Sequence, residues 1–168
     1  MASTGIVVTY PPGGGGDAHG HEKVTRTGIA GGLARLKGFD FMEEYDPSFR
    51  HSGPVYFVPA DTLDDVEARG LGIRGDRDLF GGVVPHRFVA TKAITHPLVE
   101  PDASAPAGWS RDFGRRVRGA VLSGFTVFTV RDARRAGMRL LDRGPVRLKP
   151  VRAAGGRGQA VVSGAAEL

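Results

Sequence analysis

The sequence of 168 residues contains no cysteine. Disulfides and thiolate metal sites are therefore excluded, and a reducing compartment is compatible with this composition. No apolar run approaches the roughly 20 residues that a membrane-spanning helix needs, so we expect no membrane partner. The start MASTGIVVTYPPGG lacks the basic and long apolar segments of a signal peptide, and we expect a cytoplasmic protein.

Lysine is also scarce, because the chain has four lysines against 19 arginines. Residues 1–84 carry 8 Lys/Arg and 12 Asp/Glu, a balance of −4, whereas residues 85–168 carry 15 and 6, a balance of +9. The positive half would attract nucleotide phosphate or a nucleic-acid backbone, unless its arginines only decorate solvated helix faces. Lysine carries a compact point charge rather than a planar fork, which makes Lys92 and Lys149 candidates for sites that need one.

A composition of 40% hydrophobic residues is enough to bury the core of one domain or slightly more. The 26 glycines and 11 prolines cluster at junctions between apolar runs. This distribution favours an α/β protein with many turns over a disordered chain.

Two strands and two helices are predicted in the first half. The apolar runs Gly5–Tyr10 and Gly53–Leu63 predict strands, the second running into a turn. Helices are predicted over residues 22–38 and Leu63–Arg69. The β-α-β-α order predicts a small parallel sheet of the doubly wound, Rossmann-like type. The expected inner face of the first helix is Val24, Ile29, Leu33 and Leu36, and the expected N-caps of the second are Asp61 and Thr62.

The second half is predicted to end in an antiparallel hairpin. Residues 111–124 predict a basic helix, Phe125–Val130 a strand, and residues 133–144 a helix capped by Asp132. The last two strands flank a glycine-rich loop in VRLKPVRAAGGRGQAVV, residues 146–162, and the loop is short enough for a hairpin. The side chains expected to face inward are Phe113, Val117 and Val121 in the first helix, and Ala133, Ala136, Met138, Leu140 and Leu141 in the second.

The loop Ala153–Gln159 is a candidate phosphate-binding loop. Its glycines let backbone amides come close to a ligand, and successive amides form anion-binding nests. Arg157 adds a cation within the loop, and Lys149 lies on the preceding strand, held extended by Pro150. The alternative is a flexible hairpin tip with a chance lysine.

Other polar clusters favour no particular chemistry. The glycine-rich stretch at residues 13–20 does not fit the P-loop, since His21-Glu22 stand where Lys-Ser/Thr is needed. His86 and His96 flank Lys92, where a histidine is either a general base or structural. No Ser-His-Asp order supports a hydrolase. The possible metal ligands Asp17, His19, His21 and Glu22 are better explained as a mobile polar loop, so we assign no metal site.

Several segments resemble known families. GPVRLKPVRAAGGRGQAVV resembles the Lys-Pro pair and glycine-rich loop of ATP-grasp proteins, and VATKAITHPL resembles the segment with their first ATP-contacting lysine. More narrowly, GHEKVTR, YFVPADTL, DLFGGVVPH and FVATKAITHPLV resemble a bacterial family, domain of unknown function 3182, described as biotin-carboxylase-like. The resemblance covers nearly the whole chain.

The resemblance implies a pre-ATP-grasp-like domain over residues 1–90 and the start of an ATP-grasp domain over residues 91–168. Lys92 and Lys149 would contact ATP phosphates as point charges. Magnesium ligands and acceptor contacts would lie beyond residue 168, so we expect an N-terminal fragment that is inactive by itself. The flap over the phosphates would be formed by Gly155, Gly156, Arg157, Gly158 and Gln159.

The resemblance further implies that the parent protein binds Mg-ATP and activates an unidentified carboxylate as an acyl phosphate, for attack by an amine or another nucleophile. One alternative is a non-catalytic nucleotide- or metabolite-binding module of the same fold. Another is a nucleic-acid binder that uses the basic half. Against it, the aromatic residues are better explained as core than as a base-stacking platform: Trp109, Phe113, Phe125 and Phe128.

Overall fold

The computed structural model describes residues 5–11, 20–153 and 155–168. The chain forms two compact units, Met1–Pro85 and His86–Leu168. The resemblance implies a domain boundary between residues 90 and 91. The correspondence of the two units to a pre-ATP-grasp domain and the start of an ATP-grasp domain stays a prediction.

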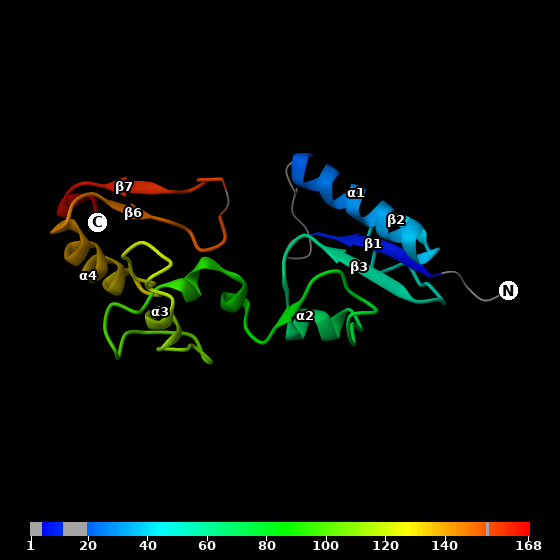
Figure 1. Ribbon diagram of the computed structural model, residues 1–168, viewed down its shortest axis with the longest axis horizontal. Helices are drawn as coiled ribbons and strands as arrows, with labels where there is room; N and C mark the ends of the chain where they lie inside the picture. The colour runs from blue at the N-terminus through cyan, green and yellow to red at the C-terminus, as the bar shows by residue number, and fades with distance from the viewer. Residues whose placement is uncertain (1–4, 12–19, 154) are drawn as a thin grey trace. The chain divides into compact units, whose positions relative to one another are not determined.

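The first unit is built on a three-stranded parallel sheet (Figure 1). Its strands are β1 (Ile6–Tyr10), β2 (Asp40–Glu44) and β3 (Val55–Pro59), in the order β2-β1-β3. Both pairings of β1 are parallel, with Ile6 opposite Asp40 on one side and Val55 on the other. The predicted small parallel sheet is therefore confirmed.

Helices cover both faces of this sheet, α1 (Gly20–Lys37) one face and α2 (Asp65–Gly70) the other. Side chains alternate across a strand, so neighbouring residues of β1 enter different clusters. The cluster under α1 consists of Val7, Tyr56, Val58, Ala30 and Ala34. The cluster on the other face consists of Ile6, Val8, Phe57, Leu63, Ala68, Ile73 and Leu79.

The inner face predicted for α1 is correct only at Leu33, which packs against the cluster under the helix. Val24 and Leu36 are 70% and 85% exposed, whereas Arg26, Ala30 and Ala34 are buried. These three residues recur every fourth position and form one helical stripe. The small side chains of the two alanines bring the helix backbone close to the sheet, and this close packing, rather than the largest apolar residues, decides the orientation.

Two details of the first unit also differ from prediction. β2 was not predicted, because four of its five residues are exposed and its sequence DFMEE lacks an apolar run. The N-cap of α2 is Asp64, whose side chain accepts a hydrogen bond from the Glu67 N–H at 2.8 Å, so Asp61 and Thr62 are not the caps. Asp64 also belongs to β4 (Leu63–Asp64), which pairs in parallel with β5 (Val83–Val84).

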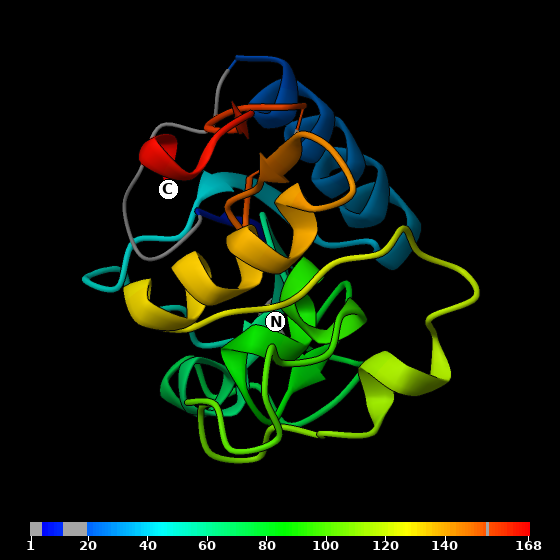
Figure 2. The same ribbon diagram turned by 90° about the vertical axis from the view of Figure 1, so that its left-hand side faces the viewer.

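The second unit contains the predicted antiparallel hairpin, labelled β6 and β7 in Figure 1 and viewed roughly along its strands in Figure 2. Val146 and Val162 lie opposite each other in the hairpin, and both are buried. A separate core cluster contains Val99, Ala103 and Ala136, with Leu98, Phe125 and Val127 packed against it. The elements of this unit are η2 (Arg87–Ala90), η3 (Lys92–Thr95), α3 (Phe113–Arg116), α4 (Val130–Leu141), β6 (Val146–Leu148), β7 (Ala160–Val162) and η4 (Ala165–Glu167).

The helix predicted over residues 111–124 is reduced to the single turn of α3, and Phe113 is 39% exposed rather than buried. Gly114 is buried instead, because this turn packs against the backbone of His96 and Pro97. The strand predicted over Phe125–Val130 is also wrong. Thr126 forms only an isolated parallel bridge with Leu98, and α4 already begins at Val130.

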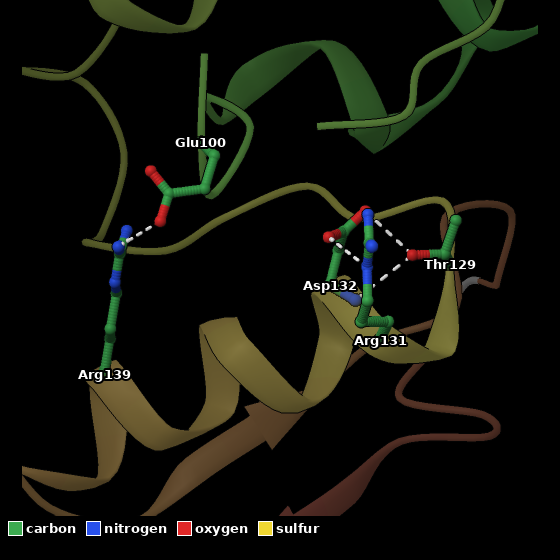
Figure 3. Close-up of polar contacts among 5 residues, drawn as sticks. All are labelled: Glu100, Thr129, Arg131, Asp132 and Arg139. Atoms are coloured by element: carbon green, nitrogen blue, oxygen red, sulfur yellow. Dashed lines mark hydrogen bonds and ion pairs between the residues drawn. The ribbon is translucent and has the colours of Figure 1, made fainter. Parts of the chain in front are cut away.

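Helix α4 is capped by Thr129, not by Asp132 (Figure 3). The Thr129 hydroxyl accepts from the Asp132 N–H at 3.1 Å and donates to Asp132 Oδ2 at 2.8 Å. This reciprocal contact is a variant of the capping box. Ala136 is buried as predicted, but Met138 is 51% exposed.

Candidate functional site

The loop between β6 and β7 spans residues 149–159 and holds most of the predicted site. Lys149 follows β6 directly, and its side chain is exposed. Gln159 precedes β7, and its Oε1 accepts a hydrogen bond from the Arg147 guanidinium at 3.3 Å. The hairpin thus places Lys149 and Gln159 at the two ends of one loop.

The backbone of this loop requires glycine. Gly155, Gly156 and Gly158 have φ angles of 60°, 78° and 64°, in a region that other residues avoid. Gly158 also approaches Pro150, so that an added Cβ would lie 3.1 Å from the proline Cγ. These conformations explain the glycines at the three positions, and both tight hairpin turns and anion-binding loops use them.

Lys92 lies against the same loop, although the chain separates them by 61 residues. It is the first residue of η3, a short helix whose N-cap Thr91 accepts from the Ala93 N–H at 3.1 Å. The Lys92 ammonium donates to the Ala153 carbonyl, and its backbone N–H donates to the Val151 carbonyl at 3.4 Å. The fold thus brings Lys92 together with the loop. Sequence reasoning missed the two carbonyls, since a backbone acceptor leaves no side-chain signal.

The charge around the loop is positive. Residues 143–166 contain no Asp or Glu. Among the residues that the structure describes, neither Lys92 nor Lys149 forms an ion pair. Both ammonium groups are exposed and can receive an anion. The cations of the segment are Arg143, Arg147, Lys149, Arg152 and Arg157.

The two histidines that flank Lys92 have structural partners. His96 Nδ1 lies 2.8 Å from Thr95 Oγ1, and its Nε2 lies 3.0 Å from the Leu122 carbonyl oxygen. His86 stacks on Phe88, with ring centroids 5.4 Å apart. The Phe88 ring in turn contacts Trp109, which packs edge-on against Phe128.

The structure describes only part of the polar cluster near the N-terminus. Asp17 and His19 of the N-terminal polar cluster lie outside the described residues. Within the described ranges, no group of three His, Cys, Asp or Glu side chains could hold a metal ion. Nor does this part of the chain contain a helix long and apolar enough to span a membrane.

The chain belongs to the family described as "Protein of unknown function (DUF3182)", whose model matches residues 12–168. No curated protein and no solved structure matches the chain. The family match contains no link to ATP-grasp proteins or to biotin carboxylase. The roles of Lys92, Lys149 and the glycine-rich loop in nucleotide binding therefore stay predictions.

Proposed function

We propose that loop 149–159, together with Lys92, binds the phosphates of ATP. The observation that carries this proposal is the contact of Lys92 with the loop at Val151 and Ala153. Lys92 thus contacts the loop that begins at Lys149, and both lysines are exposed.

The loop's chemistry suits a polyphosphate. Three glycines with positive φ let the backbone approach the ligand without a side chain in the way. A phosphate oxygen is a charged acceptor and forms stronger hydrogen bonds than a neutral carbonyl. On binding, it would replace the Ala153 carbonyl as the acceptor for Lys92. Lys149 would add the second point charge, and Arg157 and Gln159 would border the ligand.

The reaction proposed for the protein is ATP-dependent ligation of a carboxylate. A carboxylate oxygen attacks the γ-phosphorus and ADP leaves. An amine or another nucleophile then attacks the acyl carbon and expels phosphate. Magnesium would neutralise phosphate charge, but the described residues offer no cluster for it, and we assign no magnesium ligand to them. A second candidate is a non-catalytic nucleotide- or metabolite-binding module of the same fold, which would use the same loop and lysines.

Calorimetry with Mg-ATP on the complete gene product tests the proposal. We expect binding that Lys149→Ala and Lys92→Met each weaken about tenfold or more, because a hydrogen bond to a charged group contributes about 1.5–3 kcal/mol. Lys23→Met is the matched control, since Lys23 is an exposed lysine of α1 in the other unit.

No ATP binding, or equal losses from all three variants, would overturn the nucleotide assignment. Binding without ATP turnover in the presence of candidate carboxylates would favour the non-catalytic module. Tight oligonucleotide binding that weakens steeply with salt would instead support the nucleic-acid alternative.

A further inference from the structure

A pocket of about 740 Å³ lies within the second unit, apart from the residues of the proposed ATP site. Its walls are formed by His96 and Pro97, by residues between Gly114 and Phe125, and by the end of α4. Small-molecule sites typically measure roughly 300–1,000 Å³. The pocket is therefore large enough for an organic ligand.

The wall that carries Leu122 is held in place by its neighbours. His96 Nε2 lies 3.0 Å from the Leu122 carbonyl oxygen, so this nitrogen carries the proton of the hydrogen bond. Gly114 packs so closely that an added Cβ would lie 2.6 Å from the backbone of His96 and Pro97. These contacts join two sides of the pocket, the segment of His96 and Pro97 and the segment from Gly114 to Phe125.

Two arginine side chains of the lining are available to a ligand. Arg139 is already engaged, because it donates to the Val99 carbonyl at 2.6 Å and pairs with Glu100 (Figure 3). Arg118 and Arg143 form no side-chain hydrogen bond or ion pair with any residue that the structure describes. A free guanidinium offers five N–H donors in a planar fork that matches a carboxylate or phosphate.

The backbone of the same wall is also rich in unused donors. The N–H groups of residues 121–125 donate to no other described residue, and neither does the Ser123 hydroxyl. The Leu122 carbonyl, in contrast, is already taken by His96. Where these N–H groups face the pocket, they suit a ligand group that only accepts hydrogen bonds, as an ionised carboxylate does.

The local charge agrees with this preference. Asp142 contributes one negative charge, and the carbonyl end of α4 contributes roughly half of one. The two unpaired guanidinium groups outweigh both. The apolar side chains of the lining would contact an uncharged part of the ligand: Pro97, Val121, Leu122, Phe125 and Leu140.

We propose that this pocket binds a small organic oxyanion, with its carboxylate or phosphate group on Arg118 and Arg143 and its apolar part against the wall around Leu122. The inference goes beyond the proposed ATP site, with which it shares no residue. Its success or failure is therefore independent of nucleotide binding.

Ligand titrations followed by NMR on the complete gene product test it. The probes are phenylacetate, phenyl phosphate and, as their uncharged counterpart, benzyl alcohol. We expect the two anions to bind with dissociation constants of about 1 mM or below. Arg118→Gln and Arg143→Gln should each weaken binding about tenfold, since each removes a charged donor. The anion that binds more tightly identifies whether the natural ligand carries a carboxylate or a phosphate ester.

Two further variants locate the anion. Arg135→Gln removes the same charge from an exposed position of α4 outside the pocket and should leave binding unchanged. Lys149→Ala should also leave it unchanged. The proposal is overturned if neither anion binds, if benzyl alcohol binds equally well, if Arg135→Gln weakens binding as much as Arg143→Gln, or if Lys149 rather than the two arginines controls affinity.

Discussion

The Thr126 hydroxyl donates a buried hydrogen bond of 2.6 Å to the carbonyl of Ala93, the residue that follows Lys92. The Thr126 N–H donates to the Pro97 carbonyl at 2.9 Å. Thr126 therefore holds the segment before α4 against both Ala93 and Pro97, the two ends of the stretch that contains His96. This anchoring links the position of Lys92 to the core of the second unit.

We expect Thr126→Val to destabilise the protein by about 1–3 kcal/mol, because it leaves the buried Ala93 carbonyl without its donor while keeping the side chain's shape. Chemical denaturation followed by circular dichroism measures the change. Thr62→Val, at an exposed position, is the control and should alter stability by less than about 0.5 kcal/mol. Equal stability of wild type and Thr126→Val would contradict the structural role of this bond.

The start of α4 depends on the reciprocal bonds of Thr129 and Asp132 (Figure 3). We expect Thr129→Ala to cost about 1 kcal/mol of unfolding free energy, as is usual for a lost N-cap. Thr129→Ser keeps the hydroxyl and should restore most of that stability. A serine variant no more stable than the alanine variant would show that the methyl group, and not the cap, matters.

A substitution at Gly114 tests how tightly the pocket wall packs against His96 and Pro97. Gly114→Ala places a Cβ 2.6 Å from the backbone of His96 and Pro97, which cannot move aside as a flexible side chain could. We expect a loss of about 1–3 kcal/mol in stability, measured by denaturation, as for other overpacked sites. Gly119→Ala is the matched control, since an added Cβ there meets nothing within 4 Å. A similar loss in both variants would contradict the described packing.

Acid titration tests the contact between Asp112 and Arg115 at the start of α3. The pKa of Asp112 lies below its ordinary value of 3.8, chiefly because the Arg115 guanidinium donates a hydrogen bond to it and also contributes its charge. With a lowered folded-state pKa, the contribution of Asp112 to stability is present above the ordinary carboxyl range. It is lost as the pH falls through the lowered pKa.

Arg115→Gln should therefore raise the pKa of Asp112 toward 3.8, as measured by carbon-13 NMR titration of the carboxyl groups. Arg135→Gln removes an equal charge from α4 and should leave the pKa of Asp112 unchanged. An unaltered Asp112 titration in Arg115→Gln would show that the contact is not formed in solution.

Local pattern was enough to predict several elements. Continuous apolar runs rich in β-branched and aromatic residues identify β1 and β3, and two short apolar runs around a glycine-rich loop identify the hairpin β6–β7. Such elements can be predicted from the sequence because strand propensity, the pattern of apolar residues and the turn residues all favour the same structure within a short segment. The candidate loop residues, Lys149 and Gly155 to Gln159, lie together because they are neighbours in the sequence.

The tertiary structure decided what depends on distant partners. Ala30 and Ala34, not Val24 and Leu36, face the sheet, because close backbone packing outweighs side-chain hydrophobicity at that position. The run Phe125–Val130 forms no strand, since α4 begins at Val130 and Thr126 bonds instead to the segment near Lys92.

The sequence by itself therefore determined the α/β character of the chain, its parallel sheet and the composition of the glycine-rich loop. Only the folded chain brings Lys92 to that loop and places Arg118 and Arg143 in one pocket. The physical reason is that contacts across many residues arise from packing between elements. No local periodicity in the sequence encodes such packing.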